Sequence, residues 1–129
     1  MAVELNHTII PARDATAAAQ FWSDVLGLPQ PKRFGPFIAV ASDNGVGLDF
    51  AERGDDQFTR THYAFLVGED EFDAIFARIE ARGLAYWADP MQRQPQEINH
   101  RDGGRGVYFQ DPDGHFLEAL TRPYGSGSA

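Results

Sequence analysis

The sequence of 129 residues contains no cysteine, which excludes disulfides, thiolate metal ligands and a cysteine nucleophile. No long apolar run follows the start "MAVELNHTII", so the sequence predicts neither a signal peptide nor a membrane span, and we expect a cytoplasmic protein. Basic residues are few: 11 Lys and Arg stand against 19 Asp and Glu, a net charge of −8. Acidic chains bind nucleic acid and anionic membranes poorly, so we expect neither as a partner.

What the chain does contain is an internal repeat. Two stretches share one order of elements: a strand that carries a histidine, then a helix that ends at a glycine. The histidines are His7 and His62. Apolar residues at helical spacing define the helices. The predicted strand and helix are residues 3–10 and 14–26 in the first stretch, and residues 61–67 and 70–82 in the second.

Each stretch continues with a turn and a strand that carries a carboxylate. The segments "SDNGVGLDF" and "DPDGHFLEA" place Asp49 and Glu118 at the same distance after a glycine. The sequence of the second turn favours a type I turn closed by a left-handed glycine, which fixes how the two strands pair. By that count Tyr108 lies opposite Glu118, and Ala39 lies opposite Asp49. The two carboxylates therefore match, but only one has a phenol beside it.

The repeat predicts a single α+β domain over residues 1–124, built from two βαβββ modules at about 1–55 and 58–124. The second module is longer because of a polar, Gly- and Pro-bearing segment near 88–105, which we interpret as a loop. The Gly- and Ser-rich end, residues 125–129, is expected to be a flexible tail.

The segments "FWSDVLGL", "HYAFLV" and "VYFQDPDGHFLE" resemble the vicinal oxygen chelate superfamily, which includes glyoxalase I, bleomycin-resistance proteins, fosfomycin-modifying enzymes and extradiol dioxygenases. The longer strings "EFDAIFARIEARGLAYWADP" and "EINHRDGGRGVYFQDPDGH" resemble its ChaP-like group, whose namesake oxidatively rearranges a polycyclic aromatic polyketide. The resemblance implies sheets that curl into half-barrels around one metal. It also implies a homodimer in which each site joins the first module of one chain to the second module of the other.

By motif position, the resemblance implies that His7, His62 and Glu118 are metal ligands. Asp49 stands where glyoxalase-type members carry a second Glu, so it is either a fourth ligand or a base. Imidazole and carboxylate donors suit Fe(II), Mn(II), Ni(II), Co(II) or Zn(II), and open positions for substrate and dioxygen favour Fe(II). The alternative is a pair of ordinary strand histidines, but their matched repeat positions favour a metal.

Other polar and aromatic residues are candidates for the same site. Tyr108, beside Glu118, suits an acid or hydrogen-bond donor, and it matches a tyrosine near the metal of extradiol dioxygenases. His100, Arg105 and Trp87 are candidate substrate contacts; for His100 and Arg105 the alternative is plain exposure in or near the loop. His115 directly follows the turn, and we expect it to be exposed to solvent.

These residues support three functional hypotheses. The first is an Fe(II)-dependent dioxygenase that uses O2 on vicinal oxygens of an aromatic or polyketide-like small molecule. The second is a redox-neutral isomerase or lyase of the glyoxalase type, in which one carboxylate acts as the proton-transfer base. The third is a protein that sequesters an antibiotic without chemistry. Such relatives often lack the metal ligands, so the four metal-capable positions here argue against the third hypothesis.

Overall fold

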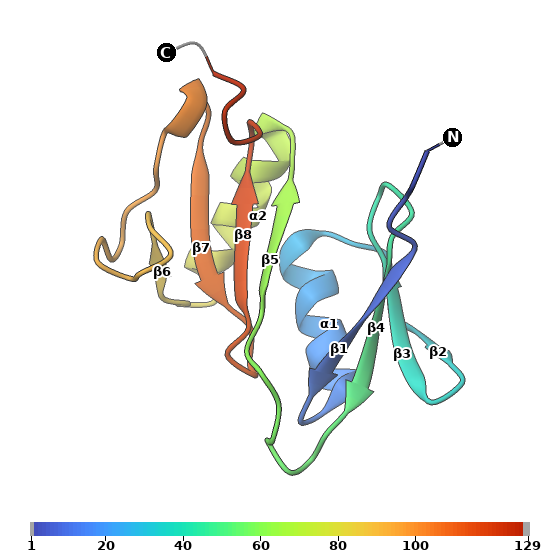
Figure 1. Cartoon of the computed structure of the whole chain (residues 1–129). Coiled ribbons are helices and arrows are strands. Elements are labelled where there is room, and N and C mark those ends of the chain that lie inside the picture. The colour runs from blue at the N-terminus through green and yellow to red at the C-terminus, as the bar shows by residue number, and fades with distance from the viewer. Residues whose placement is uncertain (1, 128–129) are drawn as a thin grey trace. The chain divides into compact units, whose positions relative to one another are not determined.

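The computed structural model describes residues 2–127, and the chain divides into two compact units, Met1–Thr59 and Arg60–Ala129. Each unit contains one α-helix and one four-stranded mixed sheet, and both follow the order βαβββ (Figure 1). The predicted α+β class with two βαβββ modules is confirmed. Neither α-helix within residues 2–127 has the length and apolarity that crossing a membrane requires.

In the first unit the sheet has the strand order β1-β4-β3-β2, in which β1 runs parallel to β4 and the other pairs are antiparallel. The predicted first strand begins at His7 rather than at residue 3. The reason is its partner: β4 starts only at Gly47, whose N–H donates to the carbonyl of Asn6, so the preceding chain lies beyond the end of β4. The elements are β1 (His7–Ala12), α1 (Ala15–Leu26), β2 (Lys32–Phe34), β3 (Phe37–Ala41) and β4 (Gly47–Glu52).

Helix α1 has the signals that the sequence predicts at both ends. The Asp14 side chain caps it by accepting the N–H of Ala17, and Gly27, with φ of 74°, ends it in the left-handed region. One face of α1 is buried, and the ring of Trp22 meets Phe50 of β4 edge-on, with centroids 5.1 Å apart. The side of the sheet that carries Phe50 therefore packs against the helix, and Asp49, the preceding residue of β4, lies on the other side.

The second unit repeats this arrangement with the strand order β5-β8-β7-β6, again with one parallel pair, β5 and β8. The segment predicted as a long loop contains only a short 3₁₀ helix, η1, and two isolated bridges. Residues 128–129 of the predicted tail lie outside the described residues. The elements are β5 (His62–Leu66), α2 (Glu69–Ala81), β6 (Tyr86–Trp87), η1 (Arg101–Gly103), β7 (Gly106–Gln110) and β8 (Phe116–Leu120).

The turn between β7 and β8 forms as its sequence predicts. Gly114 adopts φ of 86°, and the Asp111 carboxylate accepts the N–H groups of Asp113 and His115, both at 2.9 Å. This turn fixes the register, so Tyr108 pairs with Glu118. In the first unit Ala39 likewise pairs with Asp49. Both predicted pairings are confirmed.

The prediction that His115 is exposed is wrong, because the side chain is fully buried. Side chains alternate along a strand, so His115 shares the helix-facing side of the sheet with Leu117, two residues on. Its Nδ1 accepts the N–H of Thr61, and its ring meets that of Tyr63 edge-on. The alternation of side chains along the strand therefore determines the burial of His115, although the residue directly follows the turn.

Candidate active site

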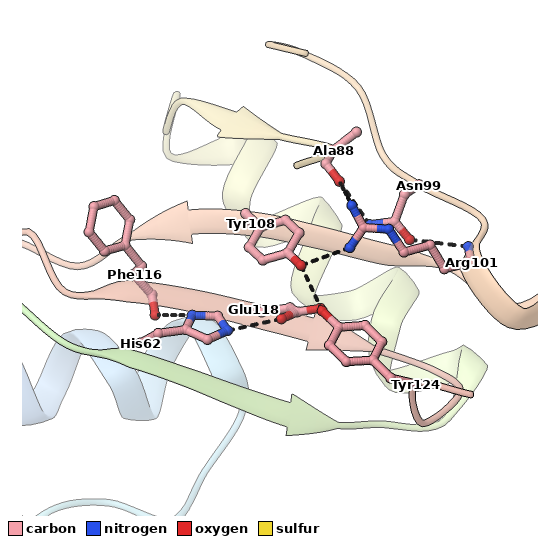
Figure 2. A network of polar contacts seen from close by, with 8 residues as sticks. All are labelled: His62, Ala88, Asn99, Arg101, Tyr108, Phe116, Glu118 and Tyr124. Carbon is pink, nitrogen blue, oxygen red and sulfur yellow. Dashed lines mark hydrogen bonds and ion pairs between the residues drawn. The ribbon is translucent and has the colours of Figure 1, made fainter. Parts of the chain in front are cut away.

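His62 of β5 and Glu118 of β8 form the polar centre of the second unit (Figure 2). The His62 Nδ1–H donates to the carbonyl oxygen of Phe116 at 3.0 Å, and its Nε2 lies 3.0 Å from Oε1 of Glu118. A carbonyl can only accept, so Nδ1 carries a proton, and Nε2 faces the carboxylate either as a second donor to Oε1 or as a lone pair that a metal can take. Glu118 is only 1% exposed, so the carboxylate is held away from bulk water.

This geometry fits a divalent metal. A lone pair on Nε2 of His62 and a carboxylate oxygen repel one another unless a proton or a cation lies between them. Two adjacent ligands at metal bonds of about 2.1 Å lie about 3.0 Å apart, which is the distance between His62 and Glu118. Histidines that bind metals commonly donate their other ring N–H to a backbone carbonyl, as His62 does.

His7 and Asp49 occupy the matching positions in the first unit. His7 pairs with Gly47, two residues before Asp49, just as His62 pairs with the residue two before Glu118. The Nδ1 of His7 lies 2.7 Å from the side-chain oxygen of Asn6, which likewise leaves Nε2 as the nitrogen available to a metal. Within residues 2–127, no group of three or more His, Asp or Glu side chains is close enough to hold a metal. The structure thus presents two matched pairs, and the four-ligand set remains a prediction.

Two residues that the sequence analysis missed, Tyr124 and Arg101, extend the site. The Tyr124 hydroxyl donates to Oε2 of Glu118, and it lies 2.6 Å from the hydroxyl of Tyr108. Arg101 Nη1 donates to that second hydroxyl at 2.9 Å (Figure 2). Each phenol has one proton, so Tyr108 donates to Tyr124, and the chain of donors runs from the guanidinium through both phenols to the carboxylate.

This series of hydrogen bonds changes the predicted relation between Tyr108 and Glu118. It pairs with Glu118 across the strands, but its hydroxyl reaches the carboxylate through Tyr124. Burial raises the pKa of Tyr124, and its hydrogen bonds to Glu118 and Tyr108 raise it further, so this phenol stays protonated as a donor. The ring of Tyr108 stacks beside that of His62, with centroids 5.9 Å apart.

The three predicted substrate contacts lie in different surroundings. Trp87 pairs with Tyr108 across β6 and β7, so it shares the side of the sheet that carries Glu118, and it is half-buried. His100 is exposed and directly precedes Arg101, the first donor in the series of hydrogen bonds that leads to Glu118. Both residues remain candidates for substrate binding.

Arg105 lies against the helix. Its guanidinium pairs with Glu69 and Asp73 of α2, each at 2.8 Å, and lies 4.5 Å from the ring centre of Phe72. Phe72 is fully buried under this side of the sheet, opposite the side that carries Glu118. These contacts favour a role in attaching α2 to the sheet over the predicted role in substrate binding.

The first unit has a groove of about 380 Å³ along β2 and β3. Its floor is made of small side chains on the side of the sheet that carries Asp49, and Phe34 stands exposed at its rim. A floor of this kind suits a flat apolar ligand. The residues that line it are Pro29, Gln30, Lys32, Arg33, Phe34, Ala39, Val40, Ala41 and Gly47.

Comparison with known proteins identifies the class. A model of the Glyoxalase/Bleomycin resistance protein/Dioxygenase superfamily matches residues 4–119, and the chain belongs to this family. The predicted superfamily is therefore confirmed.

Three named proteins are similar to this chain over most of its length. The solved structure of Oxidase ChaP-H1 is 61% identical, with a TM-score of 0.93 and coverage of 96% of this chain and 99% of that one. Oxidase ChaP-H2 is 60% identical, with a TM-score of 0.94 and coverage of 99% and 100%. Glutathione transferase FosA of Serratia marcescens is 31% identical over 124 residues, which are 92% of this chain and 80% of the relative. The predicted likeness to the ChaP group is confirmed, and the named relatives are enzymes.

Proposed function

We propose that this protein is a metal-dependent enzyme of the oxygenase type, with Fe(II) as its metal. It acts on vicinal oxygens of an aromatic or polyketide-like small molecule. The observation that carries the proposal is the pair His62 and Glu118, whose ring tautomer and 3.0 Å separation suit a metal. The identity of 61% to a protein named an oxidase supports oxidative chemistry.

The metal would be held by His62 and Glu118, with His7 and Asp49 as the further ligands that the repeat predicts. We place these ligands in a homodimer whose sites join the first module of one chain to the second module of the other. A bound metal would supply Lewis acidity and open positions for two substrate oxygens and dioxygen. Asp49 is only 8% exposed, so it is also suited to act as a base within a site shielded from water.

Side chains near Glu118 would donate protons to the substrate and stabilise charge on it. The hydroxyls of Tyr108 and Tyr124 hold two protons beside Glu118. Arg101 brings a fixed positive charge to the Tyr108 hydroxyl, which stabilises negative charge that develops on a nearby substrate oxygen. Tyr108 is 5% exposed, so its hydroxyl lies in a water-poor setting, whereas Arg101 is itself exposed and its charge is partly screened by solvent.

Oxygen consumption tests the proposal. The protein, purified without oxygen and loaded with Fe(II), should consume O2 when a catechol or hydroquinone is added. Glu118→Ala, treated identically, should not consume O2 above background. Absence of uptake with every catechol and hydroquinone tried would contradict the oxygenase proposal.

A second candidate is redox-neutral chemistry on the same metal, such as isomerisation or group transfer. The identity of 31% to a protein named a glutathione transferase favours it. In this case Asp49 would move a proton and no oxygen would be consumed. Turnover under argon with Ni(II) or Zn(II) would select this candidate over the first.

A further inference from the structure

The C-terminal segment after β8 is attached to η1. The carboxylate of Asp102 accepts the N–H of Gly125 at 3.1 Å and that of Gly127 at 3.2 Å. Tyr124 directly precedes the first of these glycines, so the hydrogen bonds hold the chain where its phenol meets Glu118. The expected flexibility of residues 125–129 is untested, but three of these residues, Gly125, Ser126 and Gly127, have defined hydrogen bonds.

Two neighbouring residues of η1 thus hold the two phenols of the site. Arg101 binds the hydroxyl of Tyr108 directly, while Asp102 binds the backbone that carries Tyr124. Asp102 adopts φ of 57°, in the left-handed region that few residues other than Gly, Asn and Asp enter readily. A side chain at Gly127 would collide with the backbone of Asp102, so the close approach requires glycine there.

The Tyr124 side chain is placed for its hydroxyl and not for packing. The residue is 58% exposed, so it buries little apolar surface. Its hydroxyl nevertheless reaches the buried carboxylate of Glu118 and the hydroxyl of Tyr108. The two carboxylate oxygens consequently have different partners: Oε1 faces His62, and Oε2 is engaged by Tyr124.

We infer that the segment of residues 123–127 is a clamp that positions Glu118, with Tyr124 as its positioning residue and Asp102 as its anchor. Tyr124 occupies Oε2 and leaves Oε1 facing His62, where the proposed metal would be held, so the clamp would set the affinity for metal. This inference rests on the proposed function, because it assumes that Glu118 is a ligand. It adds a determinant of metal binding on the C-terminal segment.

Co(II) titration of the full-length protein under argon tests the clamp, followed by calorimetry and by the visible absorption of Co(II). Tyr124→Phe should bind Co(II) about 10- to 100-fold more weakly, since hydrogen-bond partners of metal ligands typically contribute that much. Its Co(II) spectrum should also change, because Glu118 loses the hydrogen bond that fixes its orientation. Tyr86→Phe removes a phenol that meets Phe76 of α2, and it should match the unmodified protein.

A double-mutant cycle tests the anchor. Asp102→Gly keeps the left-handed backbone accessible and removes both acceptors. It should weaken Co(II) binding in the unmodified protein and have little further effect when combined with Tyr124→Phe. Equal losses in both backgrounds would overturn the clamp, as would unchanged affinity in Tyr124→Phe while the unmodified protein binds Co(II). Failure of the unmodified protein to bind Co(II) would overturn the proposed function as well.

Discussion

The two units place an imidazole and a carboxylate in the same register, yet they surround the carboxylate differently. In the second unit Glu118 pairs with Tyr108 and is held by Tyr124. In the first unit Asp49 pairs with Ala39, whose side chain offers no hydrogen bond. One carboxylate is therefore held by a side-chain donor, while the other is shorter and has only a methyl group as its cross-strand neighbour.

The same contrast holds at two further matched positions. Gln110 and Phe116 form one pair in the second unit, where the first unit has Ala41 and Gly47. Small side chains at these positions form the floor of the groove in the first unit. The repeat therefore keeps the positions of the imidazole and the carboxylate, while the residues around them differ. Under the proposed function, the second unit would fix a metal ligand and the first unit would receive the substrate.

The largest expected effect comes from the histidine of the second unit. His62→Ala should abolish metal retention, because it removes the nitrogen that faces Glu118. Metal content after anaerobic purification measures this effect, with His100→Ala as a control that changes an exposed histidine of the loop. Unchanged metal content in His62→Ala would refute the assignment of the pair.

Asp49→Ala sharpens the comparison between the two carboxylates. Turnover should fall about 100-fold or more, whether Asp49 is a ligand or a base. Metal content then separates the roles: it falls with turnover if Asp49 is a ligand and stays constant if Asp49 is a base. Unchanged turnover and metal content together would exclude Asp49 from the site.

Ala39→Tyr gives Asp49 the same cross-strand neighbour, a tyrosine, that Glu118 has in the second unit. The larger ring should fill part of the groove and raise KM for an aromatic substrate about tenfold, while metal content stays constant. Steady-state kinetics against Ala39→Ser, which adds little volume, measures the effect. An equal KM in both variants would show that the groove does not receive the substrate.

The smallest effect is expected at Arg105. Arg105→Ala removes the ion pairs to α2 and the contact with Phe72, and should lower Tm by roughly 3 °C. KM should not change, because these contacts lie on the helix side of the sheet. Thermal unfolding and kinetics measured together test this expectation, and a raised KM with unchanged Tm would restore the substrate-binding prediction.

The fold could be predicted largely from the sequence, because local signals determined it. The repeated helix stops and the Gly-closed turns set the order of elements and the register, including the pairing of Tyr108 with Glu118. His115 was placed wrongly because proximity to a turn was weighed above strand alternation. The first strand was predicted too long, since its start depends on β4, a partner far away in the sequence.

The site could be predicted only where it follows the repeat. His62 and Glu118 have counterparts in the first unit, and the repeat revealed them. Arg101 and Tyr124 have none, because one lies in the long loop and the other follows the last strand. The only signals were a loop too long to be structureless and the "RPYG" string after β8, and neither indicates a contact with Glu118. Such contacts arise from tertiary hydrogen bonds between irregular segments, which have no sequence period.

The most direct test of the central claim compares the metal content of the unmodified protein and Glu118→Ala, both purified without oxygen and measured side by side. The account predicts a stoichiometric divalent metal, Fe(II) when iron is supplied, in the unmodified protein and none in the variant. Circular dichroism of the variant should confirm that it is folded. Equal metal content in two folded proteins would contradict the claim that Glu118 is a metal ligand.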